Sequence, residues 1–305
     1  MKAIQIQKYG HADQMSLKQV QRPKPGKGQV LVKIHDAGVN PVDWKIREGY
    51  LKDMRPTTFP YTMGQDFAGE IMTIGEGVRG FKKGDKVFGF AEGSYAEYAL
   101  ASPTGMAHIP RTMDFEHAAS IPTAGLTAWQ IVMDVAKVTK NQSVLILGAG
   151  GGVGSFAVQF AKRVGARVIA TASREDFTFL EEMGASQMLD YKTERFEDTV
   201  KDMDIVIDLV GGETLSRAYR TARQNGLIIT TVGPVDETEA MTYNVRAIPF
   251  TMKSDPDELE QIGRLVEAGN VKPRISKVMS LAEARDAEDL IQLGHPHGKV
   301  ILHVA

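Results

Sequence analysis

Residues 143–173 read SVLILGAGGGVGSFAVQFAKRVGARVIATAS, the most specific pattern in the chain. An apolar run, SVLIL, enters a glycine-rich turn, and a helical period follows with Val153, Phe156, Ala157 and Phe160 on one face. A second apolar run, ARVIATA, comes next. Strand, glycine turn, helix and strand in this order predict a βαβ unit with parallel strands.

The glycines of this segment stand where the predicted helix begins. Free backbone N–H groups and the positive end of a helix dipole favour a pyrophosphate at such a place, and missing side chains allow its close approach. The frame Gly-x-Gly-x-x-Gly is matched with one change, because it runs through Ala149, Gly151 and Gly154. A glycine pattern alone is also found in structural turns, but the surrounding strands and helix favour dinucleotide binding.

The end of the second strand bears on the choice of coenzyme. An NAD enzyme places Asp or Glu there to bind both ribose hydroxyls, whereas this chain has Ala172, Ser173 and Arg174. A hydroxyl and a guanidinium suit a 2′-phosphate, which predicts NADPH rather than NADH. Glu175 and Asp176 follow closely and support the opposite reading, and Arg174 has the alternative of being a solvated residue.

Two domains are expected from the change of pattern along the chain. Up to about residue 112, short strands alternate with Gly and Pro turn signals, which favours an all-β barrel or sandwich. Beyond it, apolar strands alternate with helices, which indicates a parallel sheet covered on both faces. We expect a catalytic domain over 1–115, completed by 268–305, and a nucleotide-binding domain over 116–267.

Composition narrows the partners. A chain of 305 residues exceeds one typical core, and 43% hydrophobic residues provide for two. The formal net charge of −2 and pI near 6.4 disfavour nucleic acid and anionic lipid. No run of about 18 apolar residues suggests a membrane span, and the first residues lack the apolar run of a signal peptide, so we expect a cytoplasmic protein.

The sequence predicts no metal site. Cysteine is absent, so thiolate ligands and nucleophiles are excluded, and a zinc ion would need His and carboxylates alone. None of the seven histidines forms a His-Glu-x-x-His pair. His295 and His297 are close in sequence, but Pro296 between them favours a polar turn.

Seven landmarks carry a family resemblance over essentially the whole chain. They are AGVNPVDWKIREG (37–49), GQDFAGEI (64–71), GVRGFKKGDKVFG (77–89), AASIPTAGLTAW (118–129), GAGGGVG (148–154), LDY (189–191) and HGKVIL (297–302). With them the chain resembles the medium-chain dehydrogenase/reductase superfamily, in its zinc-independent quinone oxidoreductase and alkenal reductase branch. The resemblance implies the α/β class, with a GroES-like β-barrel domain and a Rossmann domain.

The same resemblance bears on zinc. Zinc alcohol dehydrogenases of this superfamily carry Cys near position 40 and Gly-His-Glu near position 64, whereas this chain has Asn40 and Gly64-Gln65-Asp66. Zinc-activated alcohol oxidation is therefore not expected. Asp66 replaces an acidic residue of that motif, and plain burial is the simpler account of it.

Cofactor contacts are implied by analogy with the family. The implied roles are the nicotinamide end for Thr127, the pyrophosphate for Gly151, Gly152 and Val153, the 2′-phosphate for Ser173, Arg174 and Tyr191, and the crevice at the strand ends for Leu209, Val210, Val232 and Gly233. Lys299 is similar to a lysine near the family's C-terminus. Ordinary strand packing, a helical position for Thr127 and a solvated Lys299 are the alternatives.

Asn40 and Lys45 are the candidates for catalysis. Hydride transfer to a quinone or an α,β-unsaturated carbonyl leaves negative charge on the carbonyl oxygen, and without zinc a side-chain donor must stabilise it. The family's alkenal-reducing members resemble this chain in having lysine at the Lys45 position. The alternatives are a surface lysine, and an asparagine that satisfies loop backbone groups.

Two functions remain open from the sequence. The first is an NADPH-dependent reductase of quinones or enones, and the second is an NADPH-binding sensor or partner protein without turnover. The presence of Asn40 and Lys45 in a chain that also has the glycine turn favours the enzyme. The apolar segment Val245–Met252 predicts an edge strand that pairs with its copy in a homodimer.

Overall fold

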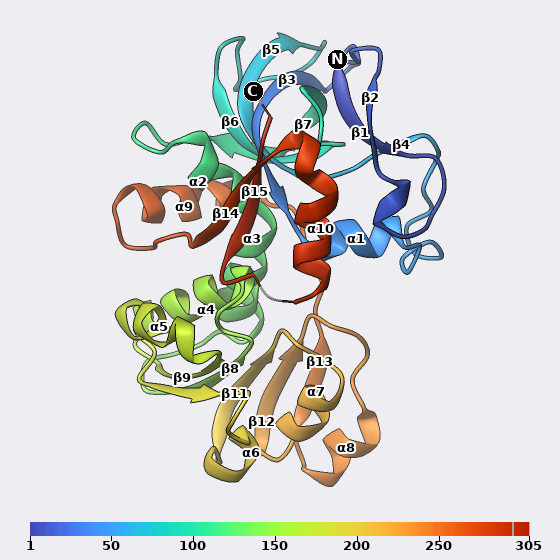
Figure 1. Cartoon of the computed structure of the whole chain (residues 1–305). Coiled ribbons are helices and arrows are strands. Elements are labelled where there is room, and N and C mark those ends of the chain that lie inside the picture. The colour runs from blue at the N-terminus through green and yellow to red at the C-terminus, as the bar shows by residue number, and fades with distance from the viewer. Residues whose placement is uncertain (295, 305) are drawn as a thin grey trace. The chain divides into compact units, whose positions relative to one another are not determined.

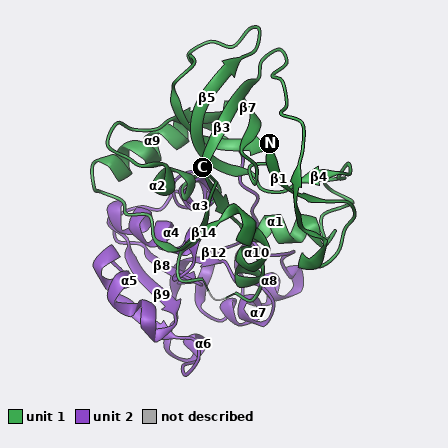
Figure 2. Ribbon diagram, turned by 45° about the horizontal axis from the view of Figure 1, so that its top comes forward, with its two compact units in different colours: residues 1–123, 254–305 green, residues 124–253 purple. Residues whose placement is uncertain are grey.

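The computed structural model describes residues 1–294 and 296–304 and divides into two units. Unit 1 comprises residues 1–123 and 254–305, and unit 2 comprises residues 124–253 (Figures 1 and 2). These boundaries differ from the expected ones, because α2 (Phe115–Ala119) and α9 (Pro256–Glu267) belong to unit 1. There α2 packs on the strands of the barrel described next, and α9 packs on β7 (Tyr98–His108). A helical pattern in sequence does not reveal which sheet the helix covers.

Unit 1 is built on a sheet in the order β14-β15-β3-β5-β6-β7. Its strands are β3 (Val30–Val39), β5 (Asp66–Ile74), β6 (Lys86–Glu92), β7, β14 (Ile275–Ser280) and β15 (Lys299–His303). The first half of β3 pairs with both β5 and β7, so that β3, β5, β6 and β7 close on one another. Alternate residues of β3, among them Val30, Val32 and Ile34, are fully buried in the core. Of the barrel and the sandwich that the short strands left open, the structure has the barrel, as the family resemblance implied.

The C-terminal segment returns to unit 1 as expected. β15 runs antiparallel to β3, with Val300 opposite Val39 and Ile301 opposite Gly38. A separate sheet of unit 1 has the order β2-β1-β4, with β1 (Lys2–Ile6), β2 (Ser16–Gln19) and β4 (Tyr61–Thr62). The remaining helical elements of this unit are α1 (Pro41–Arg47), α10 (Ala284–Gln292) and the short 3-10 turns at Ala12–Gln14 and Leu281–Glu283.

Helix α1 begins directly after β3 because its start is capped. Asn40 is the N-cap residue, its backbone N–H donates to Asp43 Oδ2 as in a capping box, and Pro41 takes the first helical position. At the other end Arg47 is fully buried, and its Nε donates to Glu288 of α10 at 2.6 Å. Its Nη2 donates to Gln292 at 2.9 Å. Both ends of this short helix are therefore tied to the barrel unit.

Unit 2 is a parallel sheet in the order β10-β9-β8-β11-β12-β13. Its strands are β8 (Ser143–Leu147), β9 (Arg167–Ala172), β10 (Gln187–Asp190), β11 (Met203–Asp208), β12 (Ala222–Thr230) and β13 (Arg246–Pro249). Counted from β8, this is the doubly wound order 3-2-1-4-5-6 of dinucleotide-binding folds. Every residue of β8 is buried, as a strand covered on both faces requires.

Helices connect the strands of unit 2. They are α4 (Gly152–Arg163), α5 (Phe177–Met183), α6 (Phe196–Thr199), α7 (Glu213–Ala218) and α8 (Glu237–Thr242), with a 3-10 turn at Arg174–Asp176. Helix α3 (Pro122–Trp129) leads from unit 1 into unit 2 and continues as a π-helical segment, Gln130–Val135.

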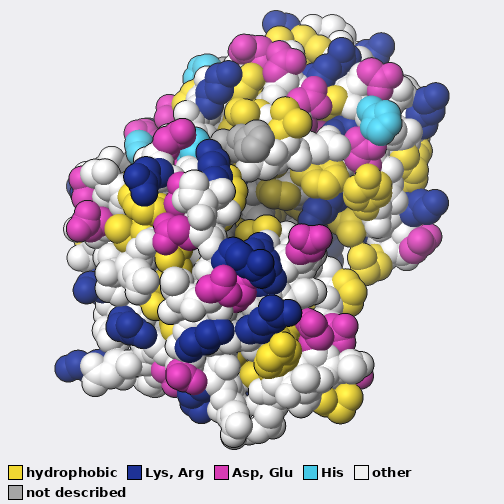
Figure 3. Space-filling model, turned by 60° about the horizontal axis from the view of Figure 1, so that its bottom comes forward, with side chains coloured by type: hydrophobic (Ala, Val, Ile, Leu, Met, Phe, Trp, Pro, Cys, Tyr) yellow, Lys and Arg dark blue, Asp and Glu magenta, His cyan; other side chains and the backbone are white. Residues whose placement is uncertain are grey.

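The surface agrees with the balanced composition. Acidic and basic side chains are interspersed over the face that Figure 3 shows, in keeping with the formal net charge of −2. Among the helices of the described residues, none has the length and apolarity that a bilayer crossing demands.

Candidate functional site

Three glycines of the turn in unit 2, Gly148, Gly150 and Gly154, make contacts that leave little room for a side chain. Gly148 has φ +82°, and its N–H donates to Thr171 Oγ1 on β9 at 3.2 Å. A Cβ on Gly154 would lie 2.4 Å from Gly148 O and 2.6 Å from the Cα of Ala149. Glycine at Gly154 is thus required for close packing of α4 against the strand.

Backbone amides at the start of α4 are available to an anion. Gly151 is the N-cap, and the first helical hydrogen bond runs from Ser155 N to Gly151 O at 3.0 Å. The amides of Gly152, Val153 and Gly154 precede that bond and are not consumed by the helix. The structure therefore places the residues predicted for the pyrophosphate at a twelve-residue helix N-terminus.

The end of β9 is tied to the glycine turn by a buried carboxylate. Ser173 Oγ donates to Asp176 Oδ2 at 3.0 Å, and Asp176 N donates to Ser173 O at 2.9 Å. A Cβ on Gly150 would lie only 2.3 Å from Asp176 Oδ2, so Asp176 packs directly against the turn. The Ser173 hydroxyl hydrogen is therefore bound within the protein, while Arg174 is exposed.

Strand β10 brings a second segment to this place. Tyr191 N donates to Ala172 O at 3.3 Å, so the residues that follow β10 lie beside those that follow β9. The Tyr191 ring is 54% exposed, and the Lys192 ammonium lies 5.9 Å from its centroid. Tyr191, predicted for the 2′-phosphate, is thus joined by a lysine that the sequence reasoning did not select.

Asp208 organises the neighbouring strand ends. It is fully buried at the end of β11, and its carboxylate accepts from Gly211 N at 3.0 and 3.1 Å and from Thr230 Oγ1 at 2.7 Å. Thr230 Oγ1 in turn accepts from Val232 N at 3.1 Å. The ends of β11 and β12, where the predicted contacts Leu209, Val210, Val232 and Gly233 lie, are therefore joined by one network.

Two predicted contacts of unit 2 differ in their exposure. Val210 is 49% exposed beside the turn, at 3.0 Å from a Cβ placed on Gly148. Thr127 lies within α3 and is 7% exposed. The roles given to these residues stay predictions.

In unit 1 the candidate Asn40 belongs to a buried polar cluster. It is 2% exposed, its backbone N–H donates to Asp43 Oδ2 at 2.8 Å, and Tyr95 Oη donates to the same oxygen at 3.0 Å. The Asn40 side-chain amide donates to Gly38 O at 3.4 Å, and its Oδ1 accepts from Lys299. Asn40 is therefore engaged within the protein, and its predicted contact with a substrate oxygen stays a prediction.

Lys299 lies in this cluster as well. Its ammonium donates to Val39 O at 3.0 Å and to Asn40 Oδ1, and it lies 3.7 Å from Asp66 Oδ2. Asp66 is fully buried and accepts from Thr123 Oγ1 at 2.6 Å and Thr123 N at 3.0 Å. The cofactor contact expected of Lys299 stays a prediction, while its contacts in unit 1 show that it is not a solvated lysine.

Burial changes the acidity of the cluster. Burial raises the pKa of Asp66, opposed by the Lys299 charge, and burial lowers the pKa of Lys299, opposed by Asp66. Burial and repulsion from Asp66 raise the pKa of Asp43 to about 6. Burial, with repulsion from Asp43, raises the pKa of Glu288 to about 8. Unit 1 thus holds several carboxyl groups that take up protons more readily than usual.

Lys45 differs from these groups because it is only partly buried. It lies on α1 with its ammonium 5.7 Å from the centroid of the Trp44 ring, and burial lowers its pKa. Trp44 also packs edge-on against Tyr50, whose side chain is 68% exposed. Of the two catalytic candidates, Lys45 is the one with surface left for a ligand.

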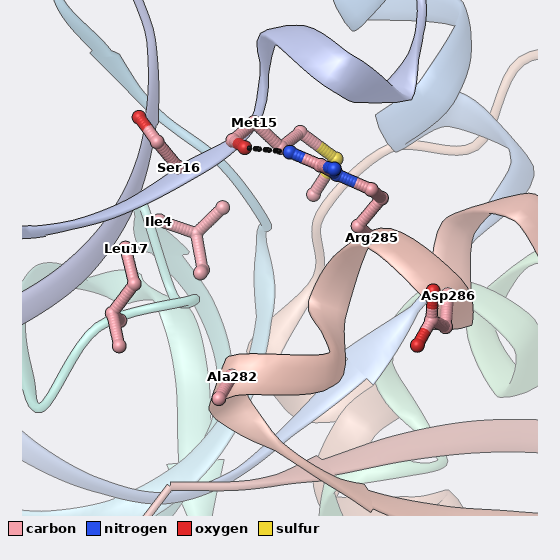
Figure 4. Close-up of a pocket in the computed structure, with 7 residues that line it drawn as sticks. All are labelled: Ile4, Met15, Ser16, Leu17, Ala282, Arg285 and Asp286. Carbon is pink, nitrogen blue, oxygen red and sulfur yellow. Dashed lines mark hydrogen bonds between the residues drawn. The ribbon is translucent and has the colours of Figure 1, made fainter.

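A pocket of about 330 Å³ lies elsewhere in unit 1 (Figure 4). Its lining consists of Ile4, Met15, Ser16, Leu17, Ala282, Arg285 and Asp286. The Arg285 guanidinium is used by the fold, since its Nη2 donates to Met15 O at 2.9 Å. None of the predicted site residues lines this pocket, so we do not assign the reaction to it.

The described ranges, 1–294 and 296–304, contain six of the seven histidines of the chain. No group of three or more His, Asp or Glu side chains there is arranged to hold a metal ion. His295, one member of the histidine pair noted in the sequence, lies outside the described residues.

Three family models match the chain. They are an alcohol dehydrogenase GroES-like domain over residues 26–111, an alanine dehydrogenase/PNT C-terminal domain over 124–213 and a zinc-binding dehydrogenase over 183–302. A curated relative, a chloroplast envelope quinone oxidoreductase homolog of Arabidopsis thaliana, is 34% identical, and the match covers 99% of this chain and 98% of that protein.

Solved structures agree with this match. The quinone oxidoreductase from Coxiella burnetii superposes with a TM-score of 0.93 at 34% identity, covering 100% of this chain and 99% of that one. A mycobacterial protein solved in complex with NADPH superposes with a TM-score of 0.92 at 25% identity, covering 99% of this chain and 100% of that one.

Proposed function

We propose a function for this chain from the premise that it belongs to the quinone oxidoreductase branch of the medium-chain dehydrogenase/reductase superfamily. The protein is an NADPH-dependent, zinc-independent reductase of quinones or α,β-unsaturated carbonyl compounds. The observation that carries the proposal is the glycine turn, with its available amides at the N-terminus of α4 and basic side chains beside the end of β9.

NADPH fits the residues of unit 2. Gly150 and Gly154 have no space for a Cβ, and the amides of Gly152, Val153 and Gly154 suit the pyrophosphate. Arg174, Tyr191 and Lys192 are exposed at adjoining strand ends, where a 2′-phosphate needs cationic partners. Of the two carboxylates that follow β9, Asp176 is 3% exposed and accepts from Ser173, which leaves it poorly placed to select the ribose hydroxyls of NADH, while Glu175 is exposed beside Arg174.

Bound NADPH supplies the hydride, and the chain must stabilise the charge that develops on the substrate oxygen. Lys45 performs this task as a charged donor, with water as the source of the final proton. Partial burial of Lys45 strengthens the electrostatic effect of its ammonium on the substrate oxygen. Because Lys45 lies on α1 between the anchored residues Asn40 and Arg47, the motion of its backbone is restricted. Trp44 and Tyr50 offer apolar surface for a flat conjugated ring.

The test is turnover of NADPH with a panel of quinones and enones, compared between the wild type and Lys45→Ala. We expect kcat with the best substrate to fall by on the order of 10²-fold, as when one donor to an oxyanion is removed. The dissociation constant of NADPH should stay unchanged. Lys52→Ala, which removes an exposed lysine just beyond α1, is the matched control.

Three outcomes would contradict parts of the proposal. Full turnover by Lys45→Ala would remove Lys45 from the mechanism. Tight NADPH binding without turnover of any compound would favour an NADPH sensor or partner protein. Loss of activity on chelation, with recovery on adding zinc, would contradict zinc independence.

The protein is also proposed to be a homodimer. β13 lies within the segment Val245–Met252 and pairs with β12 along one side. Its other side is the sheet edge that we expect to pair with the same segment of a second copy. Ile248→Asp should give a monomeric mass by light scattering, whereas a wild-type monomer at micromolar concentration would contradict the proposal. The expected cytoplasmic location stays a prediction, which cell fractionation checks.

A further inference from the structure

The ammonium of Lys299 is enclosed by oxygens from three different segments. Lys299 begins β15 and is 4% exposed. Its partners are Val39 O at the end of β3, Asn40 Oδ1 at the cap of α1, and Asp66 Oδ2 at the start of β5, the last at 3.7 Å. Two of the three N–H donors of the ammonium thus make hydrogen bonds, to Val39 O and Asn40 Oδ1, and Asp66 is its ion-pair partner.

Burial of a charged ammonium destabilises the folded state unless its interactions stabilise the fold or the site. A buried ammonium loses its hydration, and only well-placed oxygens and a carboxylate offset that loss. A backbone carbonyl, an amide oxygen and a carboxylate are also the ligands that hard cations prefer. Lys299 thus supplies an internal cation that joins three segments separated widely in sequence.

The segment most dependent on this cation is the first half of α1. A helix of seven residues is too short to be stable without external support. Its last residue, Arg47, has its own buried partners on α10, at 2.6 Å to Glu288 and 2.9 Å to Gln292. Its first turn relies on Asn40 and Asp43, and the Asn40 oxygen is held by Lys299.

We propose that Lys299 is a positioning residue for the reaction: through Asn40 its ammonium holds the start of α1, and thereby fixes Lys45 on the same helix. The proposal rests on the proposed function, since it takes Lys45 as the donor to the substrate oxygen. It gives Lys299 a role different from a direct contact with the cofactor. Removal of the ammonium should lower kcat if Lys299 positions Lys45, and should weaken NADPH binding if Lys299 contacts the cofactor.

Lys299→Met keeps an unbranched apolar stem and removes the charge. We expect kcat with the best quinone or enone to fall by roughly 10- to 100-fold, the range that a small misplacement of a catalytic group produces. The NADPH dissociation constant should change less than about twofold, because the ammonium's partners all belong to unit 1. A rise of the NADPH dissociation constant without a fall in kcat would overturn the proposal in favour of a cofactor contact.

A double variant shows whether Lys299 acts through Lys45. Groups that act as one unit give non-additive losses, so Lys299→Met should lower kcat little further in a Lys45→Ala background. If the fall in kcat of the double variant equals the product of the two single falls, the proposal would be overturned. Lys277→Met is the matched control, because Lys277 is an exposed lysine on β14, the strand next to β15.

A second measurement needs no turnover, so it separates this proposal from the proposed function. The chain has two tryptophans, and Trp44 lies on α1 beside Lys45. In a Trp129→Phe background, Lys299→Met should shift Trp44 emission to longer wavelength, whereas Lys277→Met should not. An unchanged emission would overturn the proposal even in an active enzyme, and a shift in a protein without turnover would support the positioning while the proposed function fails.

A second variant keeps the proposal testable if Lys299→Met fails to fold. Lys299→Met leaves Asp66 as a buried carboxylate without its cation, which destabilises a fold strongly. If circular dichroism shows that Lys299→Met is unfolded, Lys299→Met combined with Asp66→Asn removes both charges. The same fall in kcat and the same emission shift are expected of it, and wild-type values for both would overturn the proposal.

Discussion

Ser173 Oγ donates to Asp176 Oδ2 at 3.0 Å, and each of these residues is 3% exposed. This bond gives the acidic residue after β9 a structural task, because the same carboxylate oxygen lies where a side chain on Gly150 would have to fit. Of the two carboxylates that supported NADH in the sequence, Asp176 is therefore committed to the glycine turn, and Glu175 stays exposed. Coenzyme choice falls to the exposed side chains around it.

Arg174 should discriminate between the coenzymes. We expect Arg174→Ala to raise the dissociation constant of NADPH by roughly 10- to 100-fold, as loss of a charge-assisted phosphate contact does. NADH should bind as before, because it lacks the 2′-phosphate. Fluorescence titration with both coenzymes measures this, with Arg163→Ala on the exposed end of α4 as the control. Equal losses for both coenzymes would speak against a 2′-phosphate contact.

Two neighbouring glycines should respond differently to alanine. Gly150→Ala places a Cβ 2.3 Å from Asp176 Oδ2, so we expect about 1–3 kcal/mol of lost unfolding free energy. At Gly151 the nearest atom is 3.5 Å away and φ is −77°, so Gly151→Ala should fold normally. It should nonetheless weaken coenzyme binding if the pyrophosphate approaches that backbone. Urea unfolding and coenzyme titration of both variants check the contrast, which equal stabilities would contradict.

The pH dependence of turnover should report on Lys45. As a donor it must carry its proton, so kcat is retained below its pKa and lost as the pH rises through it. Since burial lowers this pKa, the loss should begin at lower pH than for a solvated lysine. In Lys45→Arg, which remains protonated, the alkaline limb of the kcat profile should move upward by at least a unit or disappear. An unmoved limb would assign it to another group.

The contribution of Asp43 and Glu288 to the free energy of unfolding should fall as the pH rises from about 4 to about 8. Asp43 and Glu288 have pKa values of about 6 and about 8 in the folded protein, above their ordinary values of 3.8 and 4.5. At these two groups the folded state therefore binds more protons than the unfolded state, and their contribution to stability is complete below about pH 4 and lost as the pH rises to about 8. Urea unfolding between pH 4 and 9 measures the decline.

Asp43→Asn should flatten that decline. The amide oxygen can still accept from Asn40 N and Tyr95 Oη, while removal of the charge also lessens the repulsion that raises the Glu288 pKa. A slope identical to the wild type would show that other groups cause the pH dependence.

Local patterns in the chain were sufficient for the βαβ unit around the glycine turn. SVLIL and ARVIATA became β8 and β9 almost residue for residue, and Val153 to Arg163 lies within α4 as the helical period indicated. These features depend on side chains a few residues apart and on solvent exclusion from both faces of a parallel sheet, which a sequence displays directly. The short strands left a barrel and a sandwich open, and the family resemblance favoured the barrel and drew attention to Asn40 and Gln65 in place of zinc ligands.

Contacts between residues far apart in the sequence could not be predicted from local patterns. Lys299 meets Asn40 across 259 residues, Arg47 meets Glu288 across 241, and Asp208 reaches Thr230 across a whole crossover helix. Each pairing depends on strand register, since β15 lies against β3 with Val300 opposite Val39. A lysine, an asparagine and an aspartate carry no local signal of one another, because burial and register arise only when the barrel closes.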